Sequence, residues 1–187
     1  SAPIVGARGR ISLVGLRHDP EPFDPVNDVA VLSLAAEIDR AAGLGGSGRN
    51  HEFQLAATWT VRGADGYSVT RETTGNVAVA SGTGTGSDRL EVDLNLAWDG
   101  KDASGHTVSV PAVHSYDVRV QLLRRFTGPG TGPRCSRGET AVVTGPGAPA
   151  CVVDEVSVER AGTIAVNHIP FASDSPDTAE AVRRLEI

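Results

Sequence analysis

Apolar and polar residues alternate along much of this chain, and the alternation predicts β-strands. In residues 53–61 the odd positions are apolar and the even positions are mostly polar, and residues 90–96 and 116–122 repeat the pattern. Successive side chains of a strand point to opposite faces, so a period of two marks a strand with one buried face. We therefore predict three half-buried strands at these positions.

Further strands are predicted between these three. The apolar run 29–39 has helix-forming alanines, but its length and bounding turn signals favour a buried strand. Shorter segments follow the same logic, at residues 11–16, 67–74, 77–80, 106–110, 152–158 and 163–166. Strands thus recur about every 8–15 residues with turn residues between them, a spacing typical of an antiparallel β-sandwich. The chain shows no alternation of strands with helices, so a parallel sheet is not expected.

The composition changes near residue 125 and divides the prediction in two. Residues 1–125 are expected to form the sandwich, with its core in 11–124. Residues 126–187 contain two Gly- and Pro-rich blocks around a short apolar segment at 140–143. We predict a β-hairpin extension there, packed on or joined to the sandwich. A short tail or helix follows, since Ser175, Pro176 and Asp177 form a helix-start signature.

The two cysteines, Cys135 and Cys151, flank the short apolar segment of this extension. A disulfide closing a loop of that length stabilises a fold by about 3 kcal/mol. No CxxC motif is present, so a thioredoxin-type redox site is not expected. The prediction is a structural disulfide, which favours an extracellular or cell-surface location. The alternative is two unrelated thiols.

Charge and composition exclude several classes of partner. The chain has 187 residues and a formal net charge of −6, and its basic residues form no cluster. A nucleic-acid-binding surface needs such a cluster to neutralise phosphates. No apolar run approaches the length of about 20 residues that spans a bilayer, so membrane insertion is not expected. Because the chain begins at Ser1 and contains no Met, we expect a processed form or a fragment.

One motif lies in residues 98–116, WDGKDASGHTVSVPAVHSY. It resembles the C-terminal signature of bacterial Ig-like modules of the FlgD type, which are β-sandwiches related to fibronectin type III. The matched positions include Trp98, Asp99, Gly100, Lys101, Asp102, Gly105, Val108, Pro111, Ala112 and Tyr116. Residues 23–28 echo the N-terminal signature of that family. The resemblance covers about residues 11–124 and implies an Ig-like or fibronectin III-like sandwich. Val113 stands where the family usually has glycine.

The same motif has a physical explanation that needs no chemistry. Trp98 ends a strand and would close one end of the sandwich. Asp99 can accept a hydrogen bond from the backbone two residues on, and Gly105 can take the positive φ of a turn. Pro111 interrupts the chain at a sheet edge. Trp98, Asp99, Gly100, Asp102, Gly105, Pro111 and Tyr116 are therefore predicted to be structural.

Two groups of residues contain side chains that can bind metal ions. His106 and His114 lie across one predicted hairpin and could approach an aspartate, but no third ligand has a favourable spacing. The acidic loop 19–28 has oxygen ligands but no EF-hand spacing. We expect no metal or other cofactor; a calcium ion, if bound, would use Asp24, Asn27 and Asp28.

No catalytic motif is present, so we do not expect an enzyme. There is no G-x-S-x-G sequence, and both cysteines are assigned to a disulfide. The first functional hypothesis is a structural or interaction module of a secreted or cell-surface bacterial protein, a subunit or spacer that contacts protein partners or its own copies. The alternative is an accessory module of a larger enzyme that binds carbohydrate or another ligand. Burial of both Trp59 and Trp98 would argue against the alternative.

Overall fold

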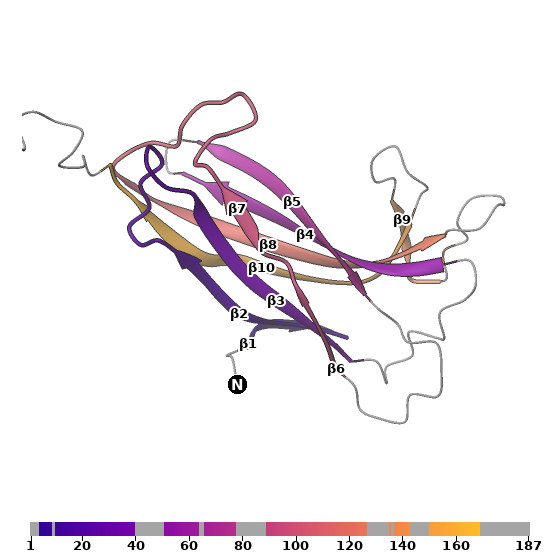
Figure 1. Cartoon of the computed structure of the whole chain (residues 1–187). Helices are drawn as coiled ribbons and strands as arrows, with labels where there is room; N and C mark the ends of the chain where they lie inside the picture. The colour runs from indigo at the N-terminus through magenta and orange to yellow at the C-terminus, as the bar shows by residue number, and fades with distance from the viewer. Residues whose placement is uncertain are drawn as a thin grey trace, which may run out of the picture.

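A computed structural model describes residues 4–8, 10–39, 51–63, 66–77, 89–126, 135, 137–142 and 150–168 of the chain. Within them every regular element is a strand (Figure 1). The strands are β1 (Ile4–Arg8), β2 (Ile11–Asp19), β3 (Ala30–Asp39), β4 (His51–Arg62), β5 (Ser68–Val77), β6 (Arg89–Asp93), β7 (Leu96–Trp98), β8 (Ala112–Phe126), β9 (Thr140–Val142) and β10 (Ala150–Val166). The predicted tail with Ser175–Asp177 lies outside the described residues.

The strands form two antiparallel sheets. The first has the order β1-β2-β3-β6, and β7 pairs with β3 beyond the end of β6. The second has the order β5-β4-β8-β10-β9. The predicted all-β antiparallel architecture is confirmed. Strand β10, from the second predicted segment, pairs with β8 from Ala150 to Val166 and so belongs to the same sheet as β4 and β5.

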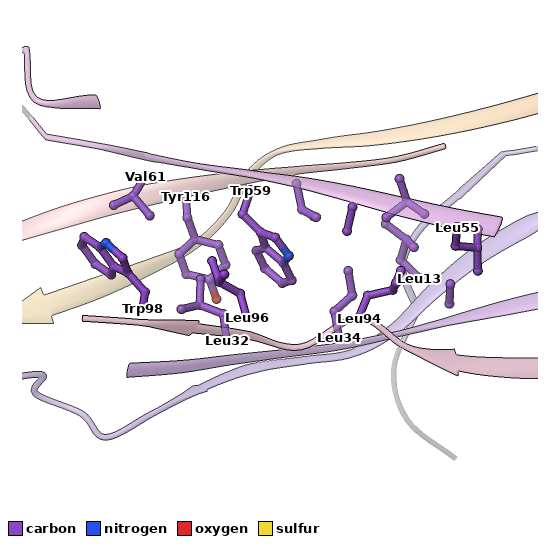
Figure 2. Packing of buried hydrophobic residues seen from close by; sticks show 14 of the residues in the cluster. Leu13, Leu32, Leu34, Leu55, Trp59, Val61, Leu94, Leu96, Trp98 and Tyr116 are labelled. Atoms are coloured by element: carbon purple, nitrogen blue, oxygen red, sulfur yellow. The ribbon is translucent and has the colours of Figure 1, made fainter. Parts of the chain in front are cut away.

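The inward faces of both sheets contribute to one hydrophobic cluster. Leu32, Leu34 and Leu94 of the first sheet lie opposite Trp59 and Tyr116 of the second (Figure 2). The odd positions of β4 from Phe53 to Val61 are buried, as the alternation predicts, and Trp59 is fully buried. Aliphatic side chains supply most of this core, because aromatics are only 4% of the residues.

Three local predictions are wrong. Residues 106–110 are not a strand: Thr107 makes one isolated bridge to Lys101. Of the two valines that gave the apparent alternation, Val108 is buried and Val110 is exposed. Residues 90–96 form two strands, because the backbone breaks at Leu94 and Asn95. There the Asn95 side chain replaces a backbone acceptor and receives the N–H of Leu34 at 3.0 Å.

The third error concerns the end of the sheet. Residues 152–158 and 163–166 are one strand, β10, with an irregularity between Val158 and Gly162. The segment 77–80 is not a separate strand at its start, since Val77 is the last residue of β5, and 78–80 lie outside the described residues. The irregularity ends at Gly162, which pairs with Tyr116. A Cβ added to Gly162 would lie 2.2 Å from the Tyr116 hydroxyl oxygen, so glycine leaves the space that the tyrosine occupies.

A buried hydrogen-bond relay joins the two sheets. The indole Nε1–H of Trp59 donates to the Thr73 hydroxyl at 3.1 Å. That hydroxyl donates to the carbonyl oxygen of Leu94 at 3.2 Å. Trp59 and Leu94 are both buried. Thr73 therefore satisfies a polar group from each sheet where water has little access.

Candidate functional site

Two loops meet at one end of the molecule, on the left in Figure 1 and opposite β9. We call this region the loop end and define it as residues 19–29, 99–111 and 166–168. Phe23 lies beside the end of β10: its N–H donates to Ala165 at 2.8 Å, and its carbonyl accepts from Asn167 at 2.9 Å. Its buried ring packs on Trp98 with 5.6 Å between ring centroids. The 19–29 loop is thus fixed to both sheets.

Asp24 organises the first loop from a buried position. Its Oδ1 accepts the N–H of Val26 at 2.9 Å, and its Oδ2 accepts the side-chain amide of Asn27 at 2.8 Å. His168 Nδ1 lies 3.1 Å from the same carboxylate. The N–H of Asp28 donates to the Asp24 carbonyl at 2.8 Å. The structure brings these candidate calcium ligands together, but it uses Asp24 and Asn27 to bond one another and the backbone.

The second loop is held by the Trp98–Gly105 motif. The N–H of Lys101 donates to Asp99 Oδ1 at 3.0 Å, and Gly105 has φ +84°; both turn predictions are confirmed. Trp98 is buried, and its Nε1–H donates to the Lys101 carbonyl at 3.0 Å. The N–H of Val108 closes the loop by donating to Gly100 at 2.7 Å. Pro111 is exposed just before β8, which is a central strand of its sheet, so the prediction that it lies at a sheet edge is wrong.

Asp102 holds the tip of the same loop. Its Oδ1 accepts the N–H groups of Ser104 and His106, each at 2.9 Å. The backbone N–H of His106 is the largest cause of a lowered pKa at Asp102, and the N–H of Ser104 acts in the same direction. Both bonds favour the charged carboxylate. Asp102 is therefore ionised at neutral pH and works as a turn-forming acceptor.

The two loops touch at Gly100. Its φ is +80°, and a Cβ there would lie 2.6 Å from Pro25 Cβ and 3.2 Å from the Phe23 ring. A side chain at this position would separate the loops, so glycine is required for the contact as well as for the backbone conformation. The loop end is consequently one body built from distant parts of the sequence.

This body leaves aliphatic side chains in water. Six large hydrophobic residues are exposed in the described part of the chain, and five of them belong to the loop end or to the strand residues that adjoin it. These five are Val26, Val29, Val31, Val110 and Val113, of which Val26 is 65% exposed and Val113 is 63% exposed. Single exposed valines are ordinary, but their confinement to one end of a molecule is a feature of interaction surfaces.

The sequence did not reveal this surface. Val29 and Val31 lie in an apolar run that predicts a buried strand, yet Val31 is exposed while Ala30 and Leu32 are buried. The period of two along residues 29–39 was the one signal in the sequence that Val31 faces away from the core. The pairing of distant strands brings Val113 to the same end as Val26. The sequence pattern does not specify this pairing.

The loop end also concentrates negative charge. Residues 19–29 and 99–111 contain six carboxylates and one lysine, a formal net charge of −5 against −6 for the whole chain. Asp24 is the only one of the six that is buried. Lys101 is exposed, and Arg71 of β5 donates to its carbonyl at 3.0 Å. The exposed valines therefore lie within an acidic surround.

Tyr116 connects the loop end to the core. It is buried, with its hydroxyl 3.3 Å from His18 Nδ1, and His18 forms an ion pair with Glu21. Burial is the main cause of a raised pKa at Tyr116, and the charge of Glu21 adds to it. The phenol is therefore protonated at physiological pH, consistent with the structural role predicted for it.

The two histidines considered as metal ligands, His106 and His114, lie in different surroundings. His114 is buried and its Nε2 lies 3.3 Å from the Ser109 carbonyl, whereas His106 is exposed and 3.6 Å from Asp102. Among the described residues, one group of three potential ligands lies close together, namely the two cysteines and Glu139. Both cysteines are in a disulfide, which removes their thiolates as ligands.

The disulfide joins Cys135 to Cys151 and belongs to the end of the molecule that carries β9. Next to it, Arg124 and Glu139 form an ion pair at 2.5 Å, and both side chains are largely buried. The disulfide thus fastens the chain before β9 to β10, the strand that pairs with both β8 and β9. A disulfide favours an oxidising compartment. No helix in the described ranges is long and apolar enough to cross a membrane.

Neither tryptophan offers an exposed ring on which a carbohydrate could stack. Trp59 and Trp98 are buried, as is Phe53, and Tyr67 is partly buried. A groove of about 460 Å³ does lie on the outward face of β5, β4, β8 and β10. Its side chains are hydroxyls and charges, including Thr58, Thr60, Thr70, Arg62, Asp117, Arg119, Ser157 and Glu159. It has no aromatic ring on which a sugar could stack.

Comparison of the chain with models of protein families, with curated proteins and with solved structures finds no match in any of the three. The resemblance to Ig-like modules of the FlgD type rests on the motif residues alone.

Proposed function

We propose that this chain is a non-catalytic interaction module of a secreted or cell-surface bacterial protein, a subunit or spacer of the Ig-like type. Its loop end is the contact surface for a protein partner. The observation that carries the proposal is the combination of order and exposure at this end. The carboxylates of Asp24, Asp99 and Asp102 accept backbone hydrogen bonds that hold the loops in place. Val26 and Val113 remain exposed to solvent.

Exposing five aliphatic side chains gives up the favourable burial of apolar surface, about 25 cal/mol per Å². Loops that are rigid before binding lose little conformational entropy when a partner arrives. A surface that is both apolar and preorganised is therefore suited to protein contact.

The single lysine makes the proposal testable. Lys101 is the only lysine of the chain and is exposed at the loop end. An amine-reactive photo-cross-linker on Lys101 would be incubated with the secreted proteins of the source bacterium. The matched control is the K101R/R137K variant, which moves the lysine to exposed Arg137 in the turn before β9. The N-terminal amine reacts equally in both proteins.

A discrete adduct from Lys101 that is absent from the control supports the proposal. Equal adducts from both proteins, or none from either, contradict the assignment of the loop end. Light scattering on the purified chain, with and without reductant, then separates the two kinds of contact. A multimer that dissociates on reduction would move the interface to the disulfide-stapled end.

A carbohydrate-binding accessory role is the second candidate, and the polar groove on the outward face of β4 and β8 is its only support among the described residues. Affinity for neutral sugars normally uses an aromatic face as well as hydrogen bonds. A glycan array with wild-type protein and Arg119→Ala tests it: binding that depends on Arg119 would favour this role.

A further inference from the structure

We infer that the partner of the loop end is a protein segment that combines arginine or lysine with aliphatic side chains. The inference rests on the proposed function and specifies the chemistry of the partner. It starts from the coincidence of two properties at one place: five of the six exposed large hydrophobic residues, and five of the six net negative charges.

The valines define the apolar half of this complementarity. Val26 and Val29 are 65% and 53% exposed on one loop, and Val110 and Val113 are 37% and 63% exposed around the start of β8. Valine offers a small branched surface with few rotamers, so little side-chain entropy is lost on contact. Such a surface is best covered by other aliphatic groups, which have no polar atom to leave unpaired.

The carboxylates define the charged half. Asp19 and Asp99 are exposed, and neither forms a side-chain ion pair among the described residues. Asp102 and Glu21 face only His106 and His18, which are charged only when protonated. Lys101 is the one permanent cation on the two loops. An acidic or neutral partner would leave this field uncompensated, whereas a basic one is attracted and oriented by it.

A second copy of the chain is the poorer occupant for the same reason. A symmetric contact places the same patch against itself, so two surfaces of net charge −5 would face each other. The chain's own net charge of −6 adds to the repulsion at long range. Self-association through the loop end is therefore an outcome that would overturn the inference.

The test selects binders without assuming their chemistry. The chain, biotinylated at a C-terminal tag, is panned against a random-peptide phage library, and enriched peptides are synthesised and measured by fluorescence anisotropy. We expect the enriched peptides to be net positive and to contain Leu, Ile or Val. Peptides that are acidic or uncharged, failure to enrich any peptide, or association of the chain with itself would overturn the inference.

Two pairs of variants separate the apolar and charged contributions. V26S/V29S is expected to weaken binding about tenfold at every salt concentration. D19N/D28N is expected to weaken it several-fold in about 50 mM salt and little in about 500 mM, where the Debye length falls below about 5 Å. The controls are Ile4→Ser, which removes the sixth exposed hydrophobic residue, and E91Q/D93N, which makes the same charge change on β6.

Equal effects of control and loop-end variants would overturn the inference. All substituted positions are exposed except Asp28, which is partly buried, and thermal unfolding checks that each variant still folds. Failure here is distinct from failure of the proposed function: an adduct at Lys101 combined with acidic peptides would keep the loop end as an interface and reject the basic partner.

Discussion

Replacing Thr73 by valine should measure how much the relay between the sheets contributes to stability. Valine has the shape of threonine without the hydroxyl, so packing is preserved while the Trp59 indole N–H loses its acceptor. The Leu94 carbonyl loses a donor at the same time. A buried polar group without a partner costs about 1–3 kcal/mol. Because Trp59 is fully buried, we expect T73V to lose about 2 kcal/mol of unfolding free energy.

Urea unfolding followed by tryptophan fluorescence is the assay, since the chain has only two tryptophans and both are buried. Thr73→Ser keeps the hydroxyl and should cost less than about 1 kcal/mol. Thr70→Val, on the exposed face of the same strand, should change stability by less than about 0.5 kcal/mol. The slope of the transition should stay constant in all variants, because the folded state is unchanged.

A double-mutant cycle tests the mechanism itself. Trp59→Phe removes the indole N–H, so in that background T73V no longer orphans a donor. The cost of T73V should then fall by about 1 kcal/mol. The reasoning is refuted if T73V is as stable as T70V, or if its cost is the same with tryptophan and with phenylalanine at position 59.

The remaining predictions concern a close approach, the disulfide and a turn. Gly162→Ala should cost about 1–3 kcal/mol, since its Cβ would overlap the Tyr116 hydroxyl; Y116F should relieve part of this cost in thermal unfolding. Reducing the Cys135–Cys151 bond, or replacing both residues by serine, should lower the unfolding free energy by about 3 kcal/mol, measured in urea with and without reductant. Asp102→Ala should speed amide hydrogen exchange in the turn, and Asp102→Asn, which keeps the acceptor, should not. Because folding lowers the pKa of Asp102, its contribution is present above the unfolded value near 3.8 and is lost as pH falls through the folded value. The protection factors of the amides in this turn, which compare the observed with the intrinsic exchange rate, should therefore fall selectively in acid.

The strands could be predicted from the sequence because the burial of one face imposes a period of two. β4 shows this most clearly, with Phe53 and Trp59 buried and Thr58 and Thr60 on the outer face. Prediction failed where side chains replace the regular backbone pattern. The side-chain oxygen of Asn95 accepts the Leu34 N–H in place of a backbone carbonyl, and the strand is interrupted there. The residues on either side of Asn95 still alternate, so the sequence gives no sign of the interruption.

The turn of the Trp98 motif was also predictable, because its chemistry is local. Asp99 reaches the backbone two residues away, and Gly105 needs only its own φ. At Asp24 the same local view offered only its neighbours in the loop as partners. The histidine beside that carboxylate, His168, is 144 residues away in the sequence, so no pattern along the chain could place it there.

The loop end was hidden for the same reason. Its charge is visible in the sequence, but the function suggested by charge depends on what lies beside it. Carboxylates exposed to water by themselves indicate only a solvated loop. Carboxylates that surround exposed valines form the surface for which we propose a basic and aliphatic partner. Phe23 creates that combination, because its bonds to Ala165 and Asn167 and its packing on Trp98 bring the first loop to the second. In the sequence Phe23 looks like one more core residue. The residue that builds the proposed interface is therefore buried and would not itself touch the partner.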